Sequence, residues 1–190
     1  MAYTSMHGTA GMLLAAISYW LFGWVGAIVL SPILSFCSHL FLLDLYPDYY
    51  PEGGWGTLVG DTFIQTIKNA LSYLSLWVVI GIILLAQAYL IHWFYVANPI
   101  LGVGLLVSWF FSNAPDFSEA LYKAFTKKSL WFMHPNGWFP KFLAKYSSTF
   151  SQKSKLPYGK AQEFEMAFNC VGLSILIVLG MYILTYGSLF

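Results

Sequence analysis

Residues 38–48 read SHLFLLDLYPD, and they hold the first charged side chain of the protein, Asp44. Residues 1–43 contain no Asp, Glu, Lys or Arg. A charge-free run of that length is enough for two membrane crossings or a tight hairpin, because one crossing takes about 20 apolar residues. His39 and Asp44 therefore lie where an apolar helix leaves the membrane. By the helical period, their side chains point about 140° apart, so other segments must complete any site that they share.

The composition is that of an integral membrane protein. Hydrophobic residues make up 58% of the 190 residues and charged residues only 9%, whereas soluble domains carry about 25% charged residues. All nine basic residues are lysine. This argues against nucleic acid as a partner, because arginine is the residue that binds phosphate in a bidentate manner. We expect a single membrane domain over residues 1–190, with membrane lipid around it.

A helical hairpin is predicted at the start of the chain. Its bend falls at Phe22-Gly23-Trp24. The first limb, residues 8–22, is short for a full span, so we expect it to be tilted, buried in the bundle or re-entrant. The second limb, residues 24–45, is long enough to cross the membrane, and Pro32 should kink it.

The rest of the chain alternates polar segments with apolar spans. Prolines and glycines predict a loop over residues 47–57, and an amphipathic stretch, residues 57–69, follows it. Asn98-Pro99 divides the next apolar run in two. The predicted later spans are residues 71–97, 99–114 and 166–190. The expected fold is therefore an all-α, polytopic membrane helical bundle with about five membrane segments.

The distribution of lysine orients the chain. Residues 117–160 carry eight of the nine lysines and a single acid, Glu119, together with many aromatic residues. The positive-inside rule makes this segment cytoplasmic and interfacial. Threading the spans back from it places the N-terminus and residues 44–68 on the cytoplasmic side and the C-terminus outside.

This threading gathers ionisable residues from several helix ends on one side of the membrane. The candidates are His7, His39, Asp44, Asp48, Asp61, Asp116 and His134. Their nitrogen and oxygen atoms suit a divalent ion such as zinc or manganese, and ionisable groups at membrane depth are functional candidates because burying them is costly. Each of them taken singly also fits helix capping or interfacial solvation; Asp116, for example, could cap a helix over residues 117–125. His92 falls on the other side and is excluded.

Four short motifs resemble a known family. MHGTAG at 6–11, SHLFLLDLYP at 38–47, GDT at 60–62 and NAPD at 113–116 are similar in order and spacing to prokaryotic proteins known as membrane-bound metal-dependent hydrolases. The resemblance covers about residues 6–136 and implies a location in the prokaryotic cytoplasmic (inner) membrane. It implies metal ligands at His7, His39, Asp44, Asp61, Asp116 and His134. The sequence departs from the family pattern at Asp48, where the family often has histidine, and near His134, where the family often has several.

Two functions are compatible with these observations. The first is a metal-dependent hydrolase with a cytoplasm-facing site at the mouth of the bundle. Its metal would polarise an ester or phosphoester, lipid-linked or soluble, and Asp44 or Asp116 would act as general base. The second is a non-catalytic structural or interaction protein, which would bind anionic lipid or a partner protein through residues 117–160, or form a homo-oligomer. Motifs of serine hydrolases and nucleotide-binding loops are absent from the sequence.

Overall fold

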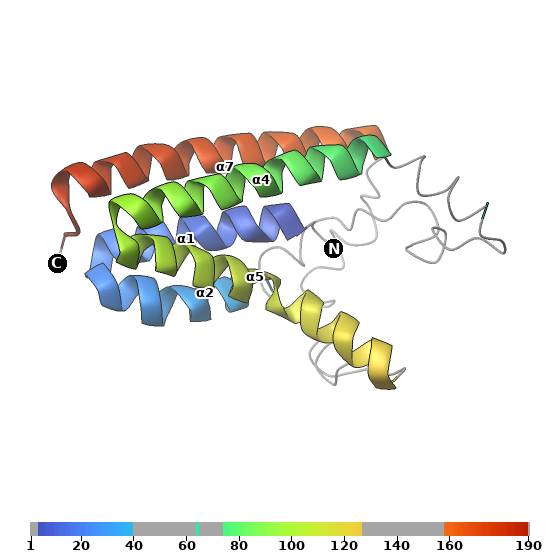
Figure 1. Cartoon of the computed structure of the whole chain (residues 1–190), viewed down its shortest axis with the longest axis horizontal. Helices are drawn as coiled ribbons and strands as arrows, with labels where there is room; N and C mark the ends of the chain where they lie inside the picture. The colour runs from blue at the N-terminus through green and yellow to red at the C-terminus, as the bar shows by residue number, and fades with distance from the viewer. Residues whose placement is uncertain (1–3, 40–63, 65–73, 127–157, 190) are drawn as a thin grey trace, which may run out of the picture.

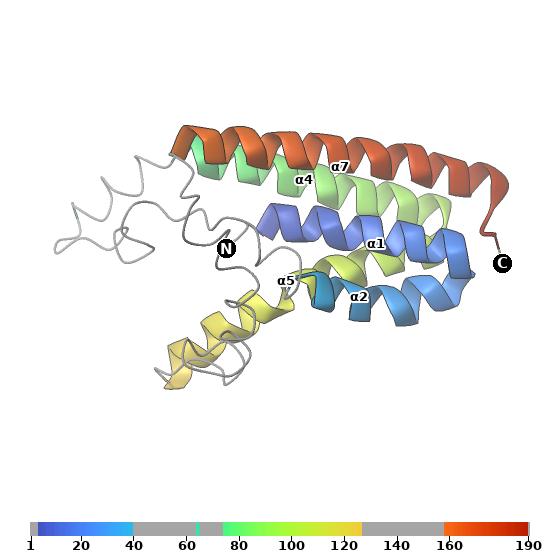
Figure 2. The same ribbon diagram turned by 180° about the vertical axis from the view of Figure 1, so that it is seen from behind.

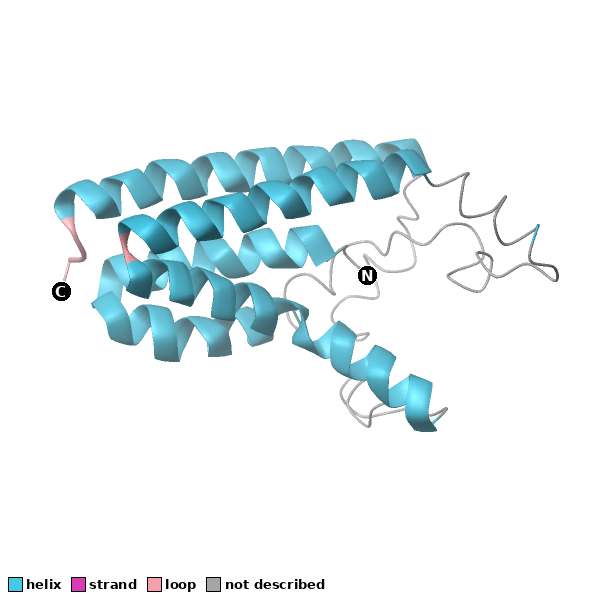
Figure 3. Cartoon of the chain, in the orientation of Figure 1, coloured by secondary structure: helices cyan, strands magenta, loops and turns pink. Residues whose placement is uncertain are grey.

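The computed structural model describes residues 4–39, 64, 74–126 and 158–189, and within these residues it contains helices and no strand (Figures 1 and 3). The elements are, in order, α1 (Thr4–Val25), the π-helix η1 (Gly26–Leu30), α2 (Ser31–Ser38), α4 (Leu74–Ala97), α5 (Pro99–Thr126) and α7 (Tyr158–Tyr186). The expected all-α architecture is confirmed for this part of the chain. The predicted loop over residues 47–57 lies outside the described residues, as does all of the amphipathic stretch except Ile64.

Three helical runs are long and apolar enough to cross a membrane. They are Ser5–Ser38, Val78–Ala97 and Met166–Tyr186, and Pro99–Pro115 is a shorter apolar helix. The outward side chains are apolar, with Leu85 72% exposed and Val178 71% exposed, whereas the polar Gln87 is buried. Polar groups facing the bundle interior and apolar groups facing outward suit lipid surroundings. The three runs therefore suggest an integral membrane protein.

Gly23 reverses the chain inside the first of these runs. Its backbone angles are φ 57° and ψ −142°, in a region that favours glycine because glycine has no Cβ atom. The limbs on either side of it run in opposite directions and lie against each other (Figures 1 and 2). The bend predicted at Phe22-Gly23-Trp24 is therefore confirmed. Gly26 allows the close approach of the limbs, because a Cβ atom there would lie 1.9 Å from the Ser18 carbonyl oxygen.

The backbone hydrogen-bond pattern of the second limb changes just before Pro32. Residues Gly26–Leu30 form a π-helical turn, and α2 begins directly after it with Pro32 in its first turn. Proline lacks an N–H group, and in a regular helix its ring collides with the carbonyl four residues earlier, here that of Ile28. A wider turn accommodates that collision. The disturbance expected at Pro32 thus takes the form of a π turn one turn earlier.

The break between α4 and α5 lies where the sequence predicted it. α4 ends at Ala97 and α5 begins at Pro99. The side chain of Asn98 caps the new helix, since its Oδ1 accepts a hydrogen bond from the Leu101 N–H at 3.1 Å. This capping satisfies one of the backbone donors that a helix start leaves unbonded.

α5 extends beyond the predicted span of residues 99–114. A separate helix over residues 117–125, capped by Asp116, was one alternative for Asp116, but α5 continues through Pro115 to Thr126. A proline inside a helix removes one hydrogen bond and bends the axis without having to end it. The final part of α5 accordingly turns away from the bundle (Figure 1).

Buried apolar side chains form one continuous core between the helices, which we call the apolar core. Its members are Met12, Ala15, Ala16, Leu90, Phe94, Leu101, Leu105, Leu176 and Ile183. Gly180 lets α7 lie directly on the ring of Phe94, because a Cβ atom there would lie 2.1 Å from the Phe94 Cζ atom. The core occupies the part of the bundle nearer the Gly23 bend, and this leaves the opposite part for polar residues.

Candidate functional site

The two N-terminal histidines meet inside the bundle. His7 lies near the start of α1 and His39 directly follows α2, and their rings stack with centroids 3.9 Å apart and planes 24° from parallel. Both residues are 0% exposed. They are brought together because the hairpin at Gly23 returns the second limb to the level at which the first began.

A backbone carbonyl fixes the orientation of His39. The Nδ1 atom of its ring lies 2.7 Å from the carbonyl oxygen of Ser112 in α5. A carbonyl can only accept, so Nδ1 carries the proton and donates it, and in the neutral ring Nε2 then carries the lone pair. Metal-binding histidines are commonly held in this way, with one ring N–H donated to a carbonyl or carboxylate. We call His7 and His39 the histidine pair.

Pro115 gives a reason for the availability of the Ser112 carbonyl. Having no N–H, Pro115 cannot bond to the carbonyl of Phe111, and its ring distorts the ladder around that position. The Ser112 carbonyl is one residue further along than the carbonyl that Pro115 leaves without a donor, and it accepts from His39. The polar side chains nearby bond to the preceding turn, with Ser112 Oγ and Asn113 Nδ2 both donating to the Trp109 carbonyl at 2.8 Å.

A hydrogen-bonded network adjoins the histidine pair and joins four helices. Gln87 of α4 donates to the Ser5 carbonyl at 2.6 Å and to Thr9 Oγ1 at 2.8 Å. Its own Oε1 accepts from Trp109 Nε1 of α5 at 2.8 Å, and Thr9 donates to Asn169 Oδ1 of α7 at 2.5 Å. We call Thr9, Gln87, Trp109 and Asn169 the polar layer. Every residue in it except Trp109 is at most 1% exposed.

Two glycines allow the polar layer to close around α1. A Cβ atom at Gly8 would lie 2.3 Å from Trp109 Nε1, and one at Gly172 would lie 2.4 Å from Thr9 Cγ2. Along α1, His7 lies between Ser5 and Thr9, the two residues to which Gln87 donates. By the rise of 1.5 Å per residue, Gln87 lies roughly 15 Å from the end of α4 at Ala97, or half the hydrocarbon thickness of about 30 Å. The layer is therefore deep inside the bundle.

The remaining predicted site residues are not placed by the described part of the chain. Asp44, Asp48, Asp61 and His134 lie outside the described residues. The backbone of Asp116 follows that of Ser112 by one turn of α5. Within residues 4–39, 64, 74–126 and 158–189, no group of three His, Cys, Asp or Glu side chains is close enough to hold a metal ion.

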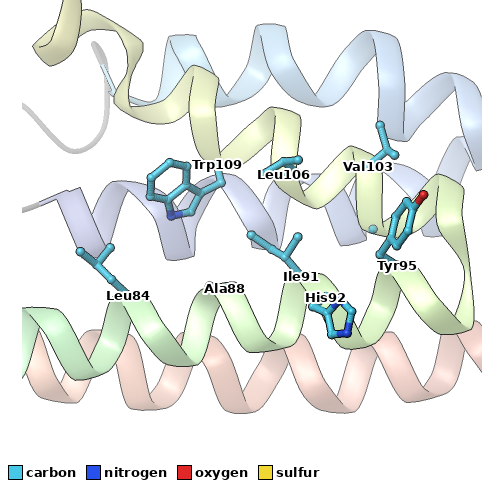
Figure 4. Close-up of a pocket in the computed structure, with 9 residues that line it drawn as sticks. Leu84, Ala88, Ile91, His92, Tyr95, Val103, Leu106 and Trp109 are labelled. Atoms are coloured by element: carbon cyan, nitrogen blue, oxygen red, sulfur yellow. The ribbon is translucent and has the colours of Figure 1, made fainter.

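His92 lies on the surface of the bundle, whereas the histidine pair is buried. It is an exposed residue on α4 that lines an apolar cavity with Tyr95 (Figure 4). It was excluded from the predicted site, and it supplies a matched control for the histidine pair.

The donor set of the pair fits a borderline metal such as zinc, since imidazole nitrogen is one of its usual ligands. Nearly parallel rings do not aim their in-plane lone pairs at a common point. Binding of one ion by both rings would need one ring to turn.

Sequence reasoning missed the Ser112 carbonyl and the polar layer. Gln87 was the available signal, because it is a polar residue in the middle of a charge-free run, but nothing in the sequence indicated which helix would supply its partners.

No protein-family model, curated protein or solved structure matches this chain.

Proposed function

We propose that the protein is a membrane-embedded, metal-dependent hydrolase in which the histidine pair supplies nitrogen ligands. The observation that carries this proposal is the burial of two stacked imidazoles, one of them oriented through Nδ1 by the Ser112 carbonyl. Ionisable side chains inside membrane segments are rare and are functional candidates for that reason. The resemblance of residues 6–136 to membrane-bound metal-dependent hydrolases supports the same function.

The residues divide into distinct roles in this proposal. His39 Nε2 presents a lone pair because Nδ1 is committed to Ser112, and His7 lies against it as the second nitrogen donor. Carboxylates from Asp44, Asp48, Asp61 and Asp116, with His134, would complete the ligand set, and Asp44 or Asp116 would accept a proton from the attacking water. A bound zinc or manganese ion would supply Lewis acidity toward an ester or phosphoester and activate the water.

The proposal includes an orientation in the membrane. We place the N-terminus and residues 117–160 in the cytoplasm and the C-terminus outside, with five membrane segments in a prokaryotic inner membrane. Support comes from the arrangement of the chain, in which the start of α1 and the start of α7 lie toward the same end of the bundle (Figures 1 and 2). Labelling of single cysteines introduced at Ala2 and at His134 from the two sides of the membrane tests this; labelling from opposite sides would contradict it.

Elemental analysis of the purified full chain tests the metal site. We expect at least one transition-metal ion per chain in the wild type, strong loss of it in His39→Ala and His7→Ala, and full retention in His92→Ala, a histidine outside the pair. Circular dichroism and gel filtration establish that each variant is folded. A wild-type protein that binds no metal after incubation with zinc or manganese would contradict the hydrolase proposal.

A second candidate function, non-catalytic binding of lipid or of a partner, is favoured by the end of α5. After Pro115 this helix leaves the bundle, and Phe117, Leu121 and Phe125 follow at four-residue spacing on one face. All three are exposed, Phe125 by 85%. An apolar stripe of this kind suits a membrane surface or a partner, including a second copy of this chain. Photo-crosslinking from position 125 in native membranes distinguishes lipid adducts from protein adducts.

A further inference from the structure

A groove runs between α4 and α5 on the outer surface of the bundle. Its volume is about 430 Å³. Leu84 and Trp109 lie at one end of it, and Tyr95 and Val103 lie at the other (Figure 4). Ala88 stands in the wall between these ends, where its small exposed side chain keeps the groove open.

The chemistry of the lining fits a hydrocarbon chain. No Asp, Glu, Lys or Arg is among the described residues that line the groove. Trp109 Nε1 donates to Gln87, which directs the one polar atom of that indole toward the polar layer and leaves ring carbon for the groove. Ligand-binding grooves of this kind gain affinity from burial of apolar surface.

The length of the groove matches one leaflet of a bilayer. Leu84 and Tyr95 are separated along α4 by roughly 16 Å at 1.5 Å per residue. Half of a hydrocarbon core about 30 Å thick is about 15 Å. The inner end lies near Gln87, level with the polar layer, and the outer end lies near the last turn of α4. An acyl chain of the leaflet on that side would fill the groove from end to end.

The outer end carries side chains typical of the headgroup level. A second cavity of about 320 Å³ shares Tyr95 and Val103 with the groove and adds Trp24. Tyr95 and Trp24 are both exposed, and such amphipathic aromatic residues gather at the membrane–water interface. His92 lies beside them in the groove wall. These groups mark the end at which the polar part of a lipid would lie.

We propose that this groove binds one acyl chain of a phospholipid whose headgroup lies at the end of the bundle away from the histidine pair. The site is separate from the proposed metal site, because its polar end is at Tyr95 and its inner end stops at Trp109. It is a lipid-binding site on the membrane-facing surface, and it does not depend on hydrolase activity.

Native mass spectrometry of the full chain tests this proposal. The protein is delipidated in detergent and titrated with dioleoyl phosphatidylethanolamine. We expect one tightly bound lipid per wild-type chain. Ala88→Phe fills the groove from α4 and Leu106→Trp fills it from α5, and each should weaken binding of that lipid about tenfold, because less apolar surface of the chain can be buried.

Leu85→Phe serves as the matched control, because Leu85 is an outward residue of the same helix and does not line the groove. It should bind lipid as the wild type does. Using two filling variants from opposite walls keeps the test valid if one of them fails to fold. Wild-type affinity in a folded filling variant, equal weakening by Leu85→Phe, or no lipid retained by the wild type would overturn the proposal.

Discussion

The apolar core and the polar layer are packed by the same helices but are held together differently. In the apolar core, Phe94 and its neighbours fit by shape, and Gly180 brings α7 onto the Phe94 ring. In the polar layer, Gln87 joins α1 to α4 and α5 by directed hydrogen bonds. Within a membrane, shape and dispersion supply most of the association between helices, whereas directed bonds fix relative positions. The comparison indicates that the core stabilises the bundle and the layer positions the histidine pair.

The largest expected effect on stability is that of Phe94→Ala. Removing a fully buried ring from the apolar core leaves a cavity beneath Gly180, and we expect unfolding in mixed micelles to become easier by about 3–5 kcal/mol. Metal content per folded chain should stay at the wild-type level, because the histidine pair is not touched. Leu85→Ala, on the outer surface of the same helix, is the control and should cost much less. Loss of metal in folded Phe94→Ala would remove the distinction between the two regions.

A smaller loss of stability is expected for Gln87→Leu, which keeps the approximate size of the side chain but removes all its hydrogen bonds. Thr9 and the Trp109 indole N–H lose a partner, and we expect a cost of about 1–2 kcal/mol. Metal retention should fall as well, since Gln87 fixes the α1 turn that carries His7. Metal content per chain and the midpoint of unfolding are measured for Gln87→Leu and for Phe94→Ala and compared. Gln87→Leu with less stability but unchanged metal would show that the layer has no positioning role.

The smallest effect on stability is expected for Pro115→Ala. This variant should also separate stability from metal affinity most clearly. Alanine restores an N–H and a regular ladder in α5, so stability should change by less than about 1 kcal/mol or increase. The Ser112 carbonyl would turn back into the helix and release His39. Loss of such an orienting partner typically lowers metal affinity about 10- to 100-fold. A competition titration with a zinc chelator measures this, and wild-type affinity would contradict the role given to Pro115.

Features set by single residues could be predicted from the sequence. The reversal at Gly23 and the break at Asn98-Pro99 follow from local backbone chemistry, and both are present. The continuation of α5 through Pro115 could not be predicted in this way. A proline only weakens a helix, and packing decides whether the helix ends or bends.

The geometry of the candidate site was harder to predict from the sequence than the identity of its residues. His7 and His39 were expected on the same side of the membrane, but their stacking depends on the π turn at Gly26–Leu30. One wider turn rotates every later residue of α2 about the helix axis relative to a regular period. The face that carries His39 therefore cannot be obtained from α-helical spacing. The Ser112 carbonyl was not foreseeable, because a backbone group carries no sequence signal.

The most direct test of the account is X-ray absorption spectroscopy of the zinc-loaded full chain in detergent. We predict zinc–nitrogen scattering at about 2.0–2.1 Å with the outer-shell pattern of imidazole. That pattern should weaken in His39→Ala and remain unchanged in His92→Ala. A spectrum without imidazole scattering, or one that His39→Ala leaves unchanged, would contradict the assignment of the histidine pair as a metal site.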